Sequence, residues 1–156
     1  MSEIVSKRLV SGDREQARRL FALMAEVFEE EGEPLGDGYL DRLLSREDFW
    51  AIAAFRGDDL VGGITAHTLP MTRAEVSELF IYDLAVRADQ QRTGVGRHLV
   101  TALRDAAAAA GIGEVFVPAD DDDVHALDFY RAIGGTASPV TFFTFSEEGN
   151  EDTEAS

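Results

Sequence analysis

The sequence contains no cysteine among its 156 residues. Disulfide bonds, thiolate catalysis and zinc–sulfur sites are therefore excluded. This composition fits a reducing compartment, and we expect the cytoplasm. Long apolar runs are also missing, since none approaches the roughly 20 residues that cross a bilayer. The first residues lack an apolar core followed by a small-residue cleavage site, so we expect no secretory signal.

Basic residues are scarce as well. Fourteen Lys and Arg stand against 30 Asp and Glu, which gives a formal net charge of −16. A surface this acidic repels nucleic acid phosphates and anionic lipid, so the expected partners are neutral or cationic and neither nucleic acid nor membrane is among them. Forty-five per cent of the residues are hydrophobic, which argues against global disorder.

The charge is unevenly distributed along the chain. Acidic residues gather at 29–33, at 120–123 and in the tail 146–156, which holds five acids and no base. Between residues 84 and 104 the sign reverses, because four arginines face only Asp89. One basic stretch in an acidic protein suggests two ligands of opposite charge, although ordinary surface scatter explains such a pattern equally well.

Hydrophobic periodicity predicts one mixed α/β domain over residues 1–145, followed by an acidic, disordered tail over 146–156. Period-two and continuous apolar runs predict strands at 4–10, 49–55, 60–69, 79–86, 114–119 and 140–145. Helical spacing predicts helices near 14–28, 39–44, 97–110 and 124–133, with Asp37 and Asp123 as caps of the second and the last. The run at 79–86 is nearly all apolar, as in a central strand covered on both faces.

A glycine-containing turn follows that central strand and opens a helix. It reads Gln91-x-x-Gly94-x-Gly96, with Arg92 and Arg97 in the same segment. Helix N-termini expose free N–H groups and carry partial positive charge, and glycine lets a phosphate approach the backbone. The turn is not a Walker A loop, because no Gly-Lys-Ser/Thr follows, and it lacks the three-glycine spacing of a dinucleotide fold.

These residues and the element order resemble the GCN5-related N-acetyltransferase (GNAT) superfamily over roughly residues 3–145. The resemblance implies a mixed central sheet flanked by helices and splayed between its fourth and fifth strands, with acetyl-CoA as the acetyl donor. It further implies that turn amides cradle the pyrophosphate while strand backbone pairs with the pantetheine arm. The implied cofactor-binding residues are Leu84, Ala85, Val86, Gln91, Arg92, Thr93, Gly94, Val95, Gly96 and Arg97.

Two residues are candidates for proton transfer. Tyr130 lies four positions before Gly134, which resembles the family's Tyr-x-x-x-Gly segment, where the hydroxyl reaches the CoA sulfur. A phenol is protonated at neutral pH and can protonate a thiolate. Asp83 lies inside an apolar strand, where a carboxylate is costly unless it is paired or functional. We expect Asp83 to act as base or amine-orienting group, with Glu78 and a water relay as competing bases.

The acceptor is expected to be a polycation. Segments around Tyr82 and Asp120 resemble the small aminoglycoside 3-N-acetyltransferases, which acetylate the 3-amine of the deoxystreptamine ring of gentamicin-type antibiotics. The acidic clusters would flank such a substrate, and the expected contacts are Glu29, Glu30, Tyr82, Asp120 and Asp123. Consecutive aspartates near His125 lack ligand spacing, so we expect no metal.

Two other functions fit the sequence. The first is acetylation of a different cationic amine, a polyamine or a basic peptide, for which the same acidic clusters would serve. The second is a non-catalytic acyl-CoA-binding module, against which the presence of Asp83 and Tyr130 argues. Many relatives of this kind pair through their C-terminal strands, so a homodimer is a further candidate assembly for this chain.

Overall fold

The computed structural model describes residues 2–147, and their elements follow the expected order up to the last helix. In chain order they are β1 (Ile4–Arg8), α1 (Arg14–Val27), α2 (Asp37–Leu44), β2 (Phe49–Arg56), β3 (Asp59–Pro70), β4 (Ser77–Val86), the 3₁₀ turn η1 (Ala88–Gln90), α3 (Val95–Ala109), β5 (Glu114–Phe116) and α4 (Val124–Ala132). The chain divides into two compact units, Met1–Pro118 and Ala119–Ser156.

The strands of the first unit form one mixed sheet in the order β1-β2-β3-β4-β5, counted within the described residues. The first four strands are antiparallel, and β4 pairs with β5 in parallel. That parallel pairing spans only Glu78–Phe80 against Glu114–Phe116, after which β4 continues to Val86 without β5. The fourth and fifth strands therefore splay apart, and the expected fold class is confirmed.

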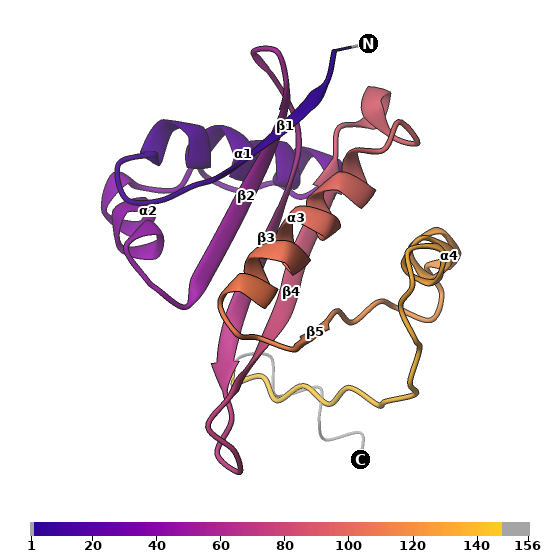
Figure 1. The fold of residues 1–156 in the computed structure, drawn as a ribbon. Coiled ribbons are helices and arrows are strands. Elements are labelled where there is room, and N and C mark those ends of the chain that lie inside the picture. The colour runs from indigo at the N-terminus through magenta and orange to yellow at the C-terminus, as the bar shows by residue number, and fades with distance from the viewer. Residues whose placement is uncertain (1, 148–156) are drawn as a thin grey trace. The chain divides into compact units, whose positions relative to one another are not determined.

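Helices cover both faces of this sheet (Figure 1). Helices α1 and α2 lie on one face, called the α1 face below, and α3 lies on the other. Each helix presents an apolar stripe at helical spacing, for example Leu20, Leu23 and Met24 of α1. Strand β2 is buried along most of its length because its alternate side chains contact helices on opposite faces.

The second unit contains α4, and it corrects one expectation. The Asp123 side chain accepts a hydrogen bond from the Ala126 amide at 3.1 Å, so Asp123 caps α4 as expected. The strand expected at 140–145 is wrong, because this segment pairs with no strand in the part of the chain that the structure describes. Its β-branched and aromatic residues match a strand, but a strand needs backbone partners. Val140, Phe142, Phe143 and Phe145 are instead 79–90% exposed.

Smaller differences occur elsewhere. Strand β5 ends at Phe116 rather than 119. Asp37 is the first residue of α2 rather than its cap, and its carboxylate pairs with arginines of α1. None of the helices in residues 2–147 is long and apolar enough to cross a bilayer. The expected tail lies outside the described residues from position 148 on, and the expected single domain over 1–145 stays a prediction.

Candidate functional site

The turn before α3 has the geometry of an anion cradle. Gly94 is the N-cap of α3 and has a φ of +96°, a left-handed conformation that favours glycine. No side chain caps the helix among the described residues, so the amides of its first turn keep their hydrogen-bonding capacity. A side chain at Gly94 would meet nothing within 4 Å, so the approach to the backbone is open. These features fit the phosphates of a nucleotide-type ligand.

Side chains of the turn tie it to the strands beside it. The Gln91 side-chain amide donates to the Val86 carbonyl oxygen at 3.2 Å, and the Thr93 hydroxyl donates to the Gln90 carbonyl oxygen at 2.6 Å. Val95 is buried at 1% exposure, so its side chain anchors the start of α3 in the core. Arg92 and Arg97 are exposed and add positive charge beside the free amides.

Arg56 at the end of β2 also holds this turn, a role that was not predicted from the sequence. Its guanidinium donates to the Gln90 side-chain oxygen at 3.0 Å, to the Thr93 carbonyl oxygen at 3.1 Å and to the Thr93 hydroxyl at 3.2 Å. It also contacts the Ser2 carbonyl oxygen. Arg56 lies 37 residues before Thr93, and no local motif connects the two positions.

The end of β4 offers free backbone next to this turn. Residues 81–86, apart from Tyr82, pair with β3 on one side, and beyond Phe80 no described strand pairs with their other side. Leu84, Ala85 and Val86 lie in this stretch. An extended amide-containing chain could add to such an edge as a further strand does. The arrangement fits the pantetheine arm that the sequence analysis expects here.

A β-bulge places Asp83 and Tyr82 at the point where the two strands diverge. Thr65 pairs with Asp83 while Ala66 pairs with Ile81, so Tyr82 has no partner on β3. A bulge re-aims side chains and is common beside active sites. Asp83 is half-buried, and burial raises its pKa, with the negative charge of Glu30 adding to the rise. His67 lowers that pKa by a smaller amount.

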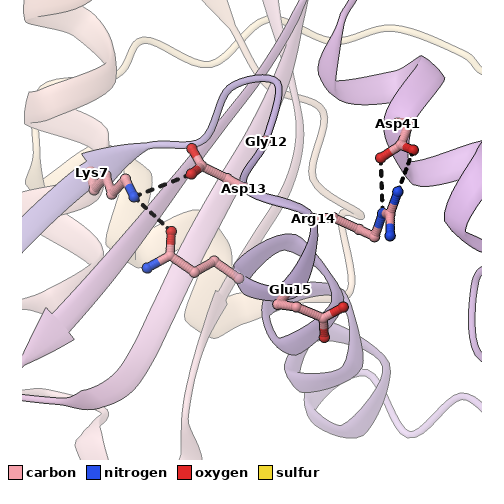
Figure 2. A pocket seen from close by; sticks show the side chains of 7 residues that line it. Lys7, Gly12, Asp13, Arg14, Glu15 and Asp41 are labelled. Atoms are coloured by element: carbon pink, nitrogen blue, oxygen red, sulfur yellow. Dashed lines mark hydrogen bonds and ion pairs between the residues drawn. The ribbon is translucent and has the colours of Figure 1, made fainter.

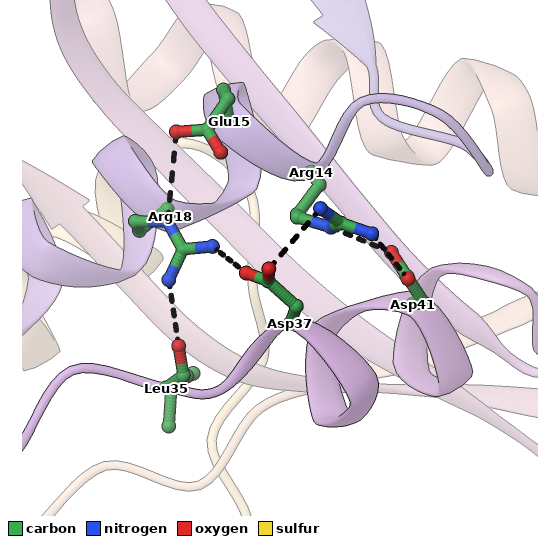
Figure 3. Close-up of polar contacts among 6 residues, drawn as sticks. All are labelled: Arg14, Glu15, Arg18, Leu35, Asp37 and Asp41. Carbon is green, nitrogen blue, oxygen red and sulfur yellow. Dashed lines mark hydrogen bonds and ion pairs between the residues drawn. The ribbon is translucent and has the colours of Figure 1, made fainter.

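Arginines of α1 anchor the acidic segment that follows this helix (Figure 3). Arg14 donates to both carboxylate oxygens of Asp41, at 2.9 and 2.6 Å, and lies 3.3 Å from Asp37. Arg18 donates to the Leu35 carbonyl oxygen at 2.7 Å and also pairs with Asp37. The loop 28–36, which carries the exposed Glu29 and Glu30, is thereby held at its C-terminal end.

The loop 28–36 is held at its other end by α1 itself. The Glu30 amide donates to the Ala25 carbonyl oxygen at 2.9 Å, and Glu29 has a φ of +57°. The backbone therefore turns sharply as it leaves the helix. Because the Glu30 charge acts on Asp83, the first unit brings two of the expected acidic residues within electrostatic range of one another.

The surface of the first unit also has two hollows. One, of about 470 Å³, surrounds the start of α1 (Figure 2). Its charged groups already pair with each other, as Lys7 does with Asp13 at 3.4 Å, and it contains none of the expected site residues. The other, of about 510 Å³, lies between β1 and α3 and includes Gly94 and Arg97. Only the second hollow adjoins the anion cradle.

The second unit carries the remaining expected residues. Tyr130 lies on α4 and is partly buried, and burial together with the negative charge of Asp123 raises its pKa. Its hydroxyl therefore stays protonated throughout the neutral range. Asp120 and Asp123 are exposed at the start of α4, where the Asp123 amide donates to the Asp120 carbonyl oxygen at 3.0 Å. In residues 2–147 no three His, Asp or Glu side chains gather in a metal-holding group.

A splayed sheet, a free strand edge and a glycine turn at a helix N-terminus together fit the acyltransferase class. Residues 14–134 match the model of the acetyltransferase (GNAT) family. The chain belongs to this family, whose members use acetyl-CoA. No curated protein matches the chain.

Solved structures resemble the chain over nearly its whole length. An aminoglycoside acetyltransferase from an uncultured soil metagenomic sample, in complex with sisomicin, is 33% identical with a TM-score of 0.89, over 93% of this chain and 97% of that one. The same protein in complex with trehalose gives a TM-score of 0.88 at the same identity and coverage. The aminoglycoside acetyltransferase AAC(6′)-Iy, in complex with a bisubstrate analogue, is similar in fold, with 13% identity, a TM-score of 0.80 and coverage of 94% and 99%.

Proposed function

We propose that this acetyltransferase moves the acetyl group of acetyl-CoA directly to the 3-amine of the deoxystreptamine ring of an aminoglycoside. The carrying observation is the position of Asp83: a half-buried carboxylate of raised pKa, at a bulge, directly before the free backbone of Leu84–Val86. The similarity to a 33% identical protein solved with sisomicin supports the choice of acceptor. We propose the cytoplasm as its compartment, in keeping with the cysteine-free composition.

The chemistry assigns one role to each named residue. Acetyl-CoA supplies an activated acetyl group as a thioester. Asp83 takes the proton of the acceptor ammonium group, which frees the nitrogen lone pair to form the N–C bond as the C–S bond breaks. Tyr130 gives its phenolic proton to the departing thiolate. An amide of Ala85 or Val86 stabilises the negative charge that develops on the carbonyl oxygen.

Charge complementarity supports the binding roles. The exposed Arg92 and Arg97 and the free amides from Thr93 onward would receive the phosphates of the donor. Glu29, Glu30, Asp120 and Asp123 would attract the ammonium groups of the acceptor, and Tyr82 would contact its body. The formal net charge of −16 favours such a polycation over an anionic acceptor.

The test is a screen for CoA release with acetyl-CoA and gentamicin, sisomicin, spermidine and a lysine-containing peptide. Release with gentamicin or sisomicin, and a product whose NMR spectrum shows acetylation at the 3-amine, supports the proposal. Acetylation at another amine would contradict the proposed position of acetylation. CoA release with spermidine or the peptide alone would show that the acceptor is a different cationic amine. Binding of acetyl-CoA without transfer to any amine favours the non-catalytic module. Expression in a susceptible bacterium tests whether the activity confers gentamicin resistance.

A further inference from the structure

Aromatic rings from neighbouring strands form a continuous row on the α1 face. Phe49 of β2 pairs with His67 of β3, His67 pairs with Phe80 of β4, and Phe80 pairs with Phe116 of β5. Directly paired residues point to the same face of a sheet. The ring centroids are 5.3 Å apart for Phe49 and His67, and 5.2 Å apart for the stacked pair Phe80 and Phe116.

A fifth ring, that of Tyr82, joins this row at the β4 bulge. Tyr82 has no partner on β3, and its ring lies 5.8 Å from His67 and 6.1 Å from Phe80, edge-to-face with both. It thereby links the β2–β3 part of the row to the β4–β5 part. Phe80 and Tyr82 are two residues apart, so strand alternation directs both side chains to one face. The bulge brings Asp83, which pairs with Thr65, to that same face.

The row becomes more exposed towards β5. Phe49 is buried at 8% exposure, whereas Phe116 is 39% and Tyr82 is 63% exposed. Single exposed apolar side chains are normal on proteins, but a contiguous set of rings at the surface marks a binding site. Phe49 belongs to the buried core cluster that α1 and α2 cover, whereas the other four rings lie outside that cluster.

Carboxylates border the row on two sides. Asp83 directly follows Tyr82, and Asp48 directly precedes Phe49. The charge of His67 acts on both carboxylates, which places them within electrostatic range of the row. A ligand suited to this surface has flat C–H faces that pack on aromatic rings and ammonium groups that interact with carboxylates and ring faces.

We propose that His67, Phe80, Tyr82 and Phe116 form the surface on which a sugar ring of the acceptor stacks, with its ammonium groups turned toward Asp83. The buried Phe49 packs against His67 and supports that surface. The inference rests on the proposed function, since it describes how that acceptor is recognised. A linear polyamine carries the same charge but no ring. The aromatic row therefore selects an aminosugar over a linear polyamine, whereas the carboxylates serve both.

The test measures binding of sisomicin and of spermidine to the full chain saturated with CoA, by isothermal titration calorimetry. Phe116→Leu and Phe80→Leu remove an aromatic face but keep an apolar side chain. Each is expected to weaken sisomicin binding about three- to tenfold, the range of one aromatic contact, and to change spermidine binding less than twofold. Tyr39→Leu is the matched control, an aromatic residue 52% exposed on α2 with no ring neighbour among the described residues. It should change neither affinity.

Three results would overturn the inference: unchanged sisomicin binding in both variants, equal weakening of sisomicin and spermidine, or no sisomicin binding by the wild-type chain. Melting temperature and CoA affinity show whether each variant folds. If Phe80→Leu does not fold, the test relies on Phe116→Leu, whose side chain is more exposed. Ring-dependent binding of sisomicin without acetyl transfer would leave this inference standing and refute the proposed function.

Discussion

One guanidinium nitrogen of Arg56 donates hydrogen bonds to both the carbonyl oxygen and the hydroxyl of Thr93, at 3.1 and 3.2 Å. The end of β2 is thereby joined to the turn that precedes α3. Because Thr93 lies beside the N-cap Gly94, the conformation of the anion cradle depends on a residue that does not belong to its motif.

Replacing Arg56 should weaken donor binding more than acceptor binding. Arg56→Met removes the bonds to Gln90 and Thr93, and hydrogen bonds of charged groups contribute roughly 1.5–3 kcal/mol each after exchange with water. We expect CoA affinity, measured by calorimetry, to fall about tenfold. Arg73→Met, at an exposed arginine of the β3–β4 turn, is the control. Unchanged CoA affinity in Arg56→Met would show that the turn holds its shape without this contact.

Asp83→Asn should abolish most turnover while leaving CoA binding intact. Loss of a general base lowers kcat about 10²- to 10⁴-fold. The same change should raise the melting temperature at pH 7. The folded-state pKa is raised, so the ionised carboxylate costs stability above that pKa, and the gain from Asn disappears as the pH falls through it. A structural carboxylate would instead give a lower melting temperature with turnover largely kept.

The pH profile of kcat/KM should have an acid limb set by Asp83. The base must be ionised, and burial and Glu30 raise its pKa above the ordinary 3.8, so activity falls as the pH drops through that raised value. Glu30→Gln removes a negative charge and should move the limb to lower pH. His67→Gln should move it to higher pH. A limb that neither substitution moves would assign the ionisation to another group, with Glu78 the first to examine.

Tyr130→Phe should lower kcat about 10²-fold with little change in CoA affinity, because only the proton donor is lost. The pKa of Tyr130 is raised by burial and by Asp123, so the hydroxyl remains protonated past the ordinary value of 10 and activity should persist to that pH. Asp123→Asn should move the alkaline limb of the pH profile to lower pH, while the Asn side chain still caps α4. Full turnover in Tyr130→Phe would mean that water protonates the thiolate.

Arg18→Met should loosen the loop 28–36. The change removes the bond to the Leu35 carbonyl oxygen and the ion pair with Asp37, for a stability loss of about 1 kcal/mol at this exposed position. Amide exchange in the loop should accelerate, and the KM for the acceptor should rise while CoA affinity holds. Arg18→Lys keeps the charge and should recover part of the effect. Equal exchange in all three proteins would show that the Glu30 bond to Ala25 suffices.

Gly62→Ala should destabilise the contact between β3 and the end of β4. An added Cβ would lie 2.7 Å from the Ala85 carbonyl oxygen and 3.0 Å from the Val95 side chain, so backbone must shift. We expect a loss of about 1–3 kcal/mol in denaturant unfolding. Gly113→Ala, where a Cβ meets nothing within 4 Å, is the control and should change stability little.

Local patterns in the sequence predicted most of the helices and strands and the glycine turn. The structure differs from these predictions where a feature depends on pairing between distant segments. The β-branched and aromatic residues at 140–145 are typical of a strand, but pairing depends on a free sheet edge that the segment itself does not specify. The bulge at Tyr82 is invisible in the sequence because register is set jointly with β3. The contacts of Arg56 and His67 are invisible for a similar reason. The partners of Arg56 lie in the turn at Gln90 and Thr93, and those of His67 lie on β2 and β4.

The sequence by itself determined what depends on neighbours along the chain. Helical and strand periodicity, the left-handed turn at Gly94 and the separation of acidic from basic stretches all follow from local backbone geometry and side-chain chemistry. Only the tertiary structure decided which distant groups meet: Arg56 with Thr93, the Glu30 charge with Asp83, and the rings of β2 to β5 in one row. These juxtapositions depend on strand register, on the bulge in β4 and on helix packing. Such features are properties of the whole sheet rather than of any one segment.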